Sequence, residues 1–408
     1  MPIRSLPGGV PEPDELFGRE HLIRCVWEFL AGNNIYLVAP RRFGKTGVMA
    51  HILKRPLEGH LAVYLDVEDV HDPEQFAAEL IAALLEQDKL RSYLTAAKGL
   101  PSRITEFLTS HIGKVGTDFF EVELKDCIHD TWKETSKALI LEMEKAKDTV
   151  VFIVDEFPQF IENVERKHRA DGARAFLEWF RSLRMKQKDR LRRFRFILGG
   201  STGIDIILRR LEVSDKLNDC FRVPVEAISK EAAEGLLKAV AEKYKLRFTP
   251  EAFARVFELI SPPVPYFLHL LVSQLILEEK LRDKALTPED IDDVYQKRLI
   301  GPACRAYFEH YRQRLRRYGA GRERAAVAIL QEIAQATTGR VSQSGLYDAY
   351  RRATGKSPSG LEFDEIMADL ENDWYVVLDP PTNEYYYLLS TMKDWWKRYY
   401  RTFKVEKR

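Results

Sequence analysis

A short loop between two apolar segments carries the residues best suited to chemistry. Residues 39–46 read A-P-R-R-F-G-K-T, follow the apolar run 35–38 and precede an apolar segment at 48–53. This order of strand, tight loop and helix is the setting of a phosphate-binding loop of the G-x-x-x-x-G-K-[ST] type, with Ala39 in place of the first glycine. The residues expected to contact a nucleotide there are Pro40, Arg41, Arg42, Phe43, Gly44, Lys45, Thr46 and Gly47.

Each residue type in this loop has a physical reason to bind phosphate. Backbone N–H groups of the loop and of the first helical turn surround the phosphate, and the helix N-terminus favours its negative charge. Gly44 lets the backbone approach without a Cβ in the way. The Lys45 ammonium can reach the β- and γ-phosphates and act in catalysis, and the Thr46 hydroxyl is placed to bind Mg²⁺. The alternative is a chance G-K-T at a strand–helix joint.

A second motif follows a run of six residues rich in β-branched side chains. Residues 149–154 read T-V-V-F-I-V, as expected for a central parallel strand buried on both faces, and Asp155 and Glu156 come directly after. Ligands bind at this end of the strands in open α/β sheets. We expect Asp155 to hold Mg²⁺ and Glu156 to orient or deprotonate the attacking water. The alternative is an ordinary surface acidic pair.

A third strand, expected at residues 194–198, runs into the sequence G-G-S-T-G at 199–203. Ser201 or Thr202 could form a hydrogen bond with the γ-phosphate or with the attacking water. The alternative is a glycine-rich turn capped by Ser or Thr.

Composition excludes several classes of protein. The chain has 408 residues, enough for two or three domains, with 45% hydrophobic and 31% charged residues. Its formal net charge of +1 predicts no polyanion partner by itself. No stretch approaches 18 apolar residues, and the N-terminus lacks the apolar core of a signal peptide, so we expect no membrane segment. Four cysteines far apart, without a C-x-x-C pair, argue against a zinc site or a disulfide framework and suit a reducing cytoplasm.

The apolar pattern predicts strands alternating with helices through residue 226. A second strand is expected at 61–67, several helices at 72–147, a helix at 172–188 and a last short strand at 221–225. This alternation predicts an α/β fold with a parallel, helix-covered sheet. From Ser229, an expected N-cap, the strands should stop and helices continue to about residue 299, one of them capped by Thr287.

The last hundred residues have a different expected order of helices and strands. Helices are expected at about 323–336, 342–353 and 361–372, followed by strands at 374–378 and 384–389. Three helices and a two-stranded hairpin form a winged-helix pattern. The expected domains are therefore an N-terminal arm at 1–15, a core at 16–226, a helical lid at 227–300 and a winged helix at 301–408.

These motifs in this order resemble the archaeal-type ATPase family, close to the STAND and origin-recognition branches of AAA+ proteins. Residues 40–46 are similar to the family's G-P-R-R-x-G-K-T loop, and residues 200–202 fall at its first sensor position. The resemblance implies a P-loop NTPase core with a helical lid and a C-terminal winged helix, and ATP and Mg²⁺ as cofactors.

Two further segments carry the resemblance. Phe17-Gly18-Arg19-Glu20 is similar to the family's F-x-G-R-E box, which lies near the adenine. Pro265-Tyr266 matches a G-G-x-P-Y segment of the lid in which the proline contacts the base, although residues 261–263 depart from its glycines.

An arginine finger cannot be assigned from the sequence. The candidates Arg209, Arg210 and Arg222 are more often surface or salt-bridged residues in such a position. Without a finger, hydrolysis by a monomer should be slow.

Basic runs raise the question of nucleic acid. Residues 184–195, 312–324 and 393–401 are rich in Arg and Lys, and the last of these runs also holds four aromatic residues. Basic and aromatic side chains together can bind phosphates and stack on bases. However, the helical spacing of the aromatic residues also suits packing against the hairpin; they are Trp395, Trp396, Tyr399 and Tyr400.

Three functions are compatible with the sequence. The first is an ATP-hydrolysing switch that acts on a partner through the winged helix. The second is an ATP-controlled DNA-binding protein of the origin-recognition type, and the third is a nucleotide-bound scaffold without turnover. The partner could be DNA or protein, and a homo-oligomer stays open.

Overall fold

The computed structural model describes most of the chain, in two compact units. The described residues are 4, 5, 7–95, 102–111, 115, 118–142, 145–185, 193–201, 203–281, 283–357 and 359–400. One unit, here called the sheet unit, consists of Arg19–Val38 and Lys45–Val225. The other, the helical unit, consists of Met1–Gly18, Ala39–Gly44 and Glu226–Arg408.

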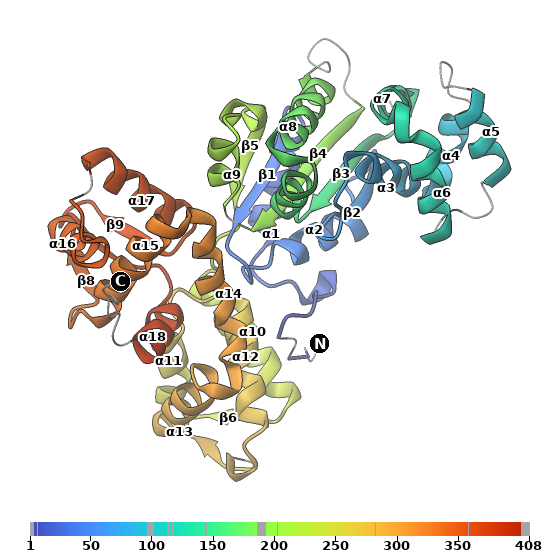
Figure 1. Ribbon diagram of the computed structural model, residues 1–408. Coiled ribbons are helices and arrows are strands. Elements are labelled where there is room, and N and C mark those ends of the chain that lie inside the picture. The colour runs from blue at the N-terminus through green and yellow to red at the C-terminus, as the bar shows by residue number, and fades with distance from the viewer. Residues whose placement is uncertain are drawn as a thin grey trace. The chain divides into compact units, whose positions relative to one another are not determined.

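A five-stranded sheet forms the centre of the sheet unit (Figure 1), in the order β2-β3-β4-β1-β5. The pairs β2–β3, β3–β4 and β1–β5 are parallel, which confirms the predicted α/β class. The strands are β1 (Asn34–Ala39), β2 (His60–Asp66), β3 (Thr149–Asp155), β4 (Phe194–Ser201) and β5 (Cys220–Pro224).

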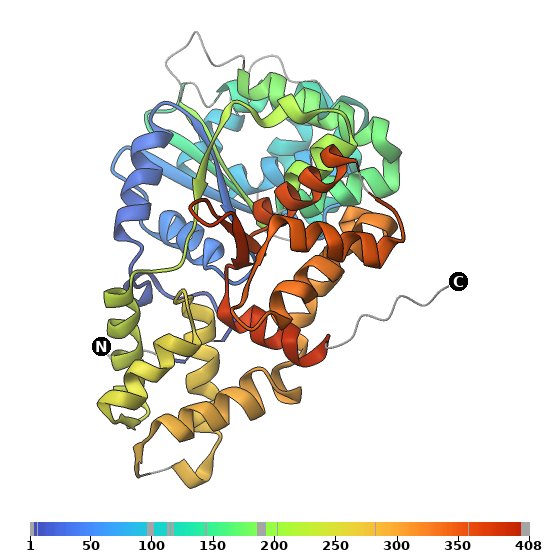
Figure 2. The same cartoon turned by 90° about the vertical axis from the view of Figure 1, so that its left-hand side faces the viewer.

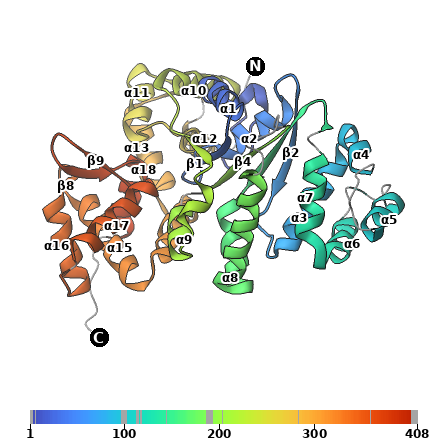
Figure 3. The ribbon, with the colours of Figure 1, turned by 90° about the horizontal axis from the view of Figure 1, so that it is seen from above.

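Helices cover both faces of this sheet. In Figure 3, α1 and α2 lie on one side of the strands, and α8 and α9 lie on the other. The chain reverses its direction across the sheet after β2, so right-handed crossovers must place the later helices on the opposite face from α2. The helices are α1 (Glu20–Leu30), α2 (Lys45–Lys54), α3 (Pro73–Glu86), α4 (Asp88–Thr95), α5 (Ser102–His111), α6 (Asp118–Ile128), α7 (Trp132–Glu142), α8 (Phe157–Met185) and α9 (Ile204–Arg210).

Aromatic residues fill the core between α3, α8 and the sheet. The Phe76 ring of α3 lies 5.1 Å from Phe160 and 5.2 Å from Phe176 of α8, measured between centroids. Helix α8 begins fifteen residues earlier than the predicted start at Gly172, and Arg169 interrupts it with φ +61°. A signal for the earlier start was present, since Phe157, Phe160, Ile161 and Val164 have the i, i+3, i+4, i+7 spacing of a helix and are buried. The charged stretch 165–171 interrupts this apolar pattern before Gly172.

A second group of helices follows β5 in the helical unit. Figure 2 shows these helices together, coloured yellow to orange: α10 (Lys230–Lys243), α11 (Pro250–Leu259), α12 (Pro265–Ile276) and α13 (Pro288–Val294). The predicted caps are confirmed, since Ser229 accepts a hydrogen bond from the N–H of Ala232 and Thr287 forms a capping box with Asp290. The prediction that strands stop at residue 229 was wrong, because β6 (Arg247–Phe248) pairs with β7 (Ala285–Leu286).

The C-terminal part of the helical unit contains the expected helices and hairpin. The antiparallel sheet has the order β8-β10-β9, so a short strand joins the predicted hairpin. The elements are α14 (Ala306–Arg314), α15 (Ala320–Gln335), β8 (Arg340–Ser342), α16 (Gln343–Thr354), α17 (Gly360–Asn372), β9 (Val376–Asp379), β10 (Glu384–Tyr387) and α18 (Ser390–Tyr399). Within the residues described, no helix is long and apolar enough to cross a membrane.

Candidate nucleotide-binding site

The loop after β1 and the acidic end of β3 meet in one hydrogen bond. The Thr46 hydroxyl, on the first turn of α2, donates to Oδ2 of Asp155 at 2.9 Å. The Asp155 side chain is only 3% exposed, and its Oδ1 accepts the backbone N–H of Glu156 at 2.9 Å. Two motifs separated by more than a hundred residues therefore lie side by side, as the sequence predicted from the parallel sheet.

These oxygen atoms form a donor set that suits Mg²⁺. The cation prefers hard oxygen ligands and is commonly held by one or two carboxylates together with phosphate oxygens. Thr46 offers a hydroxyl and Asp155 a carboxylate, with 2.9 Å between the two oxygen atoms. The residues predicted as metal ligands thus fit the chemistry of the ion.

The phosphate loop has the backbone that its sequence requires. Gly44 has φ +92° and Arg42 has φ +77°, so both residues adopt the left-handed region. For Arg42 this conformation costs about 1 kcal/mol, because its Cβ approaches the carbonyl oxygen. Lys45 begins α2 and is 6% exposed, and Gly47, two residues later in the same first turn, is also buried. The loop therefore opens directly onto a helix N-terminus, where an anion is favoured.

Glu156, the predicted catalytic base, follows Asp155 in an uncommon conformation. Its φ is +55°, and its side chain is half-buried. Non-glycine residues in this region of backbone space are rare and cluster at functional sites. The turn begins α8 immediately after the sheet, so Glu156 lies at the carboxyl edge of the strands, where the sequence placed it.

Two glycines at the end of β4 allow close packing at the same edge. A Cβ on Gly199 would lie 1.9 Å from Cε of Met49 and 3.2 Å from Oδ1 of Asp155. A Cβ on Gly200 would lie 2.1 Å from Cδ of Pro158. Ser201 is the last residue of β4, and Thr202 lies outside the described residues, so the predicted contact with the γ-phosphate stays a prediction.

The segment predicted to lie near the adenine packs against α10. Gly18 has φ +64°, and a Cβ there would come 2.6 Å from Cβ of Ala232. The Phe17 ring lies 3.6 Å from the position of a Cβ on Gly235. Arg19 directly precedes α1 and is buried. Pro265 is the first residue of α12, as expected for a helix N-terminus.

Tyr64 is a neighbour of Asp155 that the sequence reasoning missed. Its hydroxyl, on β2, donates to Oδ2 of Asp155 at 3.5 Å. Burial, followed by the charge of Asp155, raises the pKa of Tyr64 well above its usual range, so the phenol keeps its proton and remains a donor. The sequence did hold a signal for this contact: Tyr64 carries a hydroxyl two residues before the end of β2, the strand that pairs with β3.

Most of the basic candidates serve the protein's own structure. Arg210 pairs with Glu165 and Arg222 with Asp205, as expected for salt-bridged arginines. The aromatic residues of α18 also pack inside, since Trp395 and Trp396 are fully buried. The packing alternative is therefore supported for the two tryptophans, whereas Tyr399 and Tyr400 are half-buried.

The basic runs are likewise partly internal. Arg184 binds the Asp219 carboxylate through Nε at 2.7 Å, and Arg195 donates to the carbonyls of Leu30 and Ala31. Residues 186–192 and Arg401 lie outside the described residues.

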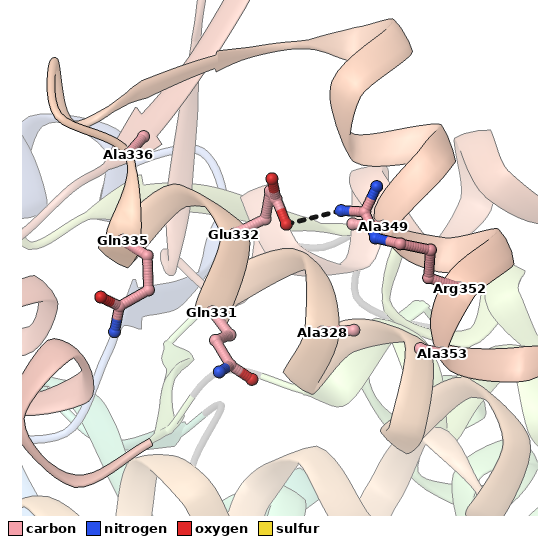
Figure 4. A pocket seen from close by; sticks show the side chains of 8 residues that line it. All are labelled: Ala328, Gln331, Glu332, Gln335, Ala336, Ala349, Arg352 and Ala353. Carbon is pink, nitrogen blue, oxygen red and sulfur yellow. Dashed lines mark hydrogen bonds and ion pairs between the residues drawn. The ribbon is translucent and has the colours of Figure 1, made fainter. Parts of the chain in front are cut away.

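A pocket on the C-terminal part of the chain includes none of the predicted site residues in its lining. Figure 4 shows an ion pair at its edge, in which Arg352 of α16 meets Glu332 of α15 at 2.7 Å. The lining is mostly small and neutral: Ala328, Gln331, Glu332, Gln335, Ala336, Ala349, Arg352 and Ala353. Nothing in this lining resembles a nucleotide site.

Comparison with solved structures identifies the fold. A Walker-type ATPase of Pyrococcus abyssi matches 94% of this chain and 97% of its own, with a TM-score of 0.63 and 17% identity. The ORC2 protein of Aeropyrum pernix, solved as ADPNP–ADP complexes, matches 98% of each chain with a TM-score of 0.53 and 14% identity. The chain has the fold of AAA+ P-loop ATPases. No family model and no curated protein matches this chain.

Proposed function

We propose that the protein is a Mg²⁺-dependent, ATP-binding and ATP-hydrolysing switch. The observation that carries the proposal is the 2.9 Å hydrogen bond between Thr46 and Asp155, beside the buried Lys45 that begins α2. It joins the two motifs that a P-loop ATPase needs, at the carboxyl edge of a parallel sheet. The AAA+ fold supports the same activity by analogy alone.

Each residue has a distinct part in this proposal. Lys45 binds the β- and γ-phosphates, and the N–H groups from Gly44 onward surround them. Thr46 and Asp155 hold Mg²⁺, which neutralises the phosphate charge when it is bound. Glu156 orients the attacking water and accepts its proton.

Further contacts are proposed around this centre. Ser201 or Thr202 contacts the γ-phosphate, while Phe17, Gly18, Arg19 and Pro265 lie near the adenine. The loop residues from Pro40 to Phe43 shape the cradle. Each of these roles is carried over from the matching position of the family's motifs.

The rest of the chain responds to the nucleotide in this proposal. Residues 227–300 act as a helical lid, and residues 301–408 form a winged-helix domain that binds a partner. The elements that support the second assignment are α15, α16 and α17 followed by the β9–β10 hairpin.

Turnover of ATP by the purified chain tests the activity. We expect Lys45→Ala to weaken nucleotide binding roughly 10- to 100-fold, because it removes a charged hydrogen-bond donor. We expect Glu156→Gln to lower the turnover rate by about 10²- to 10⁴-fold while binding persists. Lys54→Ala is the matched control, since this exposed residue ends the same helix. Equal turnover in all four proteins would contradict the proposal and favour a scaffold without turnover.

A second candidate function is ATP-controlled DNA binding of the origin-recognition type. It is favoured by Arg316 and Arg324, which are exposed in the basic run at 312–324. The burial of Trp395 and Trp396 weakens it, because these rings cannot stack on bases.

DNA binding by the full chain, measured over a range of salt concentrations, tests this candidate. Neutralising Arg316 and Arg324 should lower both the affinity and its salt dependence, whereas Lys238→Ala, on an exposed face of α10, should change neither. Absence of binding at low salt would remove the candidate.

A further inference from the structure

Aromatic side chains of the helical unit enclose the tip of the phosphate loop. The guanidinium carbon of Arg42 lies 4.3 Å from the centroid of the Tyr266 ring and 5.7 Å from that of Tyr307. Phe43 is buried and meets Trp374 edge to face, with 5.7 Å between centroids. We call Tyr266, Tyr307 and Trp374 the aromatic clamp.

The side chain of Arg42 and the backbone of Arg41 are both held by aromatic residues. An arginine above an aromatic ring at this distance is attracted by the ring's negative face. Within the described part of the chain, Nε of Arg42 is buried without a hydrogen-bond partner, so the guanidinium meets the two rings without a competing hydrogen bond at that nitrogen. In addition, the Tyr311 hydroxyl donates to the backbone carbonyl of Arg41 at 3.4 Å.

The clamp acts on a part of the loop that is intrinsically strained. Arg42 has φ +77°, which a non-glycine residue keeps only when its surroundings hold it. The following residue, Phe43, is fixed by Trp374, which lies in the turn between α17 and β9 and has φ +63° itself. The two side chains on either side of the Arg42–Phe43 peptide are therefore both anchored in residues 226–408.

Positive charge accumulates where the clamp meets the loop. His310 lies on α14, and its pKa is lowered to about 2 by burial and then by Arg314, Arg42 and Arg41. The His310 imidazole is therefore neutral, and the positive charge belongs to the three arginines. An anion at the phosphate loop would relieve the repulsion among these arginines. Occupancy of the loop should therefore favour the clamped arrangement.

We propose that Tyr266, Tyr307 and Trp374 are positioning residues. They couple the nucleotide affinity of the phosphate loop to the conformation of residues 226–408, the C-terminal region. The inference rests on the proposed function, since it takes the loop to bind a nucleoside phosphate. The clamp holds Arg42 and Phe43 in the conformation that presents the N–H groups of the loop to phosphate. Because such coupling is reciprocal, a partner that draws α14 or Trp374 away weakens nucleotide binding, and nucleotide strengthens the clamp.

The first measurement compares nucleotide affinities of ring variants in the full chain. Tyr266→Leu removes the ring beneath Arg42, whereas Tyr266→Phe keeps it and loses only a hydroxyl that has no partner among the described residues. We expect the dissociation constant for Mg·ADP to rise about 3- to 10-fold in Tyr266→Leu and to stay unchanged in Tyr266→Phe. Tyr307→Leu provides a second variant at a more exposed ring that should fold even if Tyr266→Leu does not.

The second measurement is hydrogen exchange of the loop and of α14. Without nucleotide, Tyr266→Leu or Tyr307→Leu should speed exchange of the amides of residues 41–44 relative to wild type. Adding Mg·ADP to wild type should slow exchange at residues 307–311. A clamp with a merely structural role would lower stability but would not make protection of α14 depend on nucleotide.

The outcomes separate the two proposals. One outcome would be that wild type and the Leu variants bind Mg·ADP equally well and that the nucleotide does not change hydrogen exchange of α14. That outcome overturns the coupling and leaves the proposed function standing. If wild type binds no nucleotide, both are overturned. Weaker binding by the Leu variants, together with nucleotide-dependent protection of α14, supports both.

Discussion

Gly200 lies at a point where the end of β4 has no room for a side chain. A Cβ would approach Cδ of Pro158 to 2.1 Å, and the proline ring cannot rotate away. We therefore expect Gly200→Ala to lower the free energy of unfolding by about 1–3 kcal/mol, as overpacking does elsewhere. Urea denaturation followed by tryptophan fluorescence measures the change.

Gly321 provides the matched control for this substitution. Apart from its chain neighbours and the backbone of its own helix, no described atom lies within 4 Å of a Cβ built there, and the residue belongs to the first turn of α15. Alanine is the better helix former, so Gly321→Ala should raise stability by roughly 0.5–1 kcal/mol. If both variants lost the same amount of stability, crowding at Pro158 would not be the cause.

At the level of single residues, the sequence predicted those site residues that belong to a local motif. Lys45, Thr46, Asp155 and Glu156 could be placed because each follows a recognisable strand, and parallel strands bring their ends together. Tyr64 could not, since its contact with Asp155 depends on the neighbouring strand and on side-chain direction.

Among the elements, α17 ends in a buried acid that should make stability depend on pH. Asp373 follows the last residue of α17, and its Oδ2 accepts a hydrogen bond from the Tyr318 hydroxyl at 3.0 Å. Burial raises the pKa of Asp373 to about 6 from an ordinary value of 3.8. The folded state thus binds this proton more tightly than the unfolded state does. The stability that the group contributes is full below about pH 4 and is lost as the pH rises through about 6.

Asp373→Asn should flatten this part of the stability profile. Asparagine cannot ionise, so the difference between variant and wild type should change by on the order of 2–3 kcal/mol between pH 4 and pH 7, in favour of the variant at pH 7. Urea unfolding at several pH values measures it. The exposed Asp364, on the same helix, serves as the control in Asp364→Asn. Parallel profiles for wild type and Asp373→Asn would contradict the assignment.

Helix boundaries could be predicted where a cap has a side-chain signature. Ser229 and Thr287 marked the starts of their helices. In the C-terminal part of the chain, the predicted bounds of α15, α16 and α17 lie within a few residues of those observed. The strands β6 and β7 have two residues each, too few for any period to appear. Their pairing comes from the tertiary fold and not from local preference.

At the scale of the whole molecule, the two compact units are built from interleaved segments. The sheet unit uses two stretches of chain and the helical unit uses three, with Ala39–Gly44 among them. Local periodicity predicts helices and strands, but it does not predict which distant part of the chain the loop Ala39–Gly44 will pack against. The division into two units could therefore not be predicted from the sequence. The contacts of Arg42 with Tyr266 and of Phe43 with Trp374 lie within the helical unit and tie the loop to it.

A single cut after β5 tests this interleaving. We expect that a protease site engineered between Val225 and Ser229 will yield two fragments that elute together in size-exclusion chromatography. The reason is that the N-terminal fragment still carries Arg42 and Phe43, which pack against rings in the C-terminal fragment.

Arg42→Ala combined with Phe43→Ala should weaken that association. Fragments of the cut wild type that separate at once would contradict the expectation.

Neither unit is encoded by one uninterrupted stretch of its gene. A recombination event at the junction after β5 would bring in Tyr266, Tyr307 and Trp374 without the loop that they enclose, or the loop without its rings. Exchange of the C-terminal region between related genes would therefore carry a penalty at the phosphate loop. Lineages should inherit the loop tip and the rings as one set, however freely the exposed surface of the C-terminal region diverges.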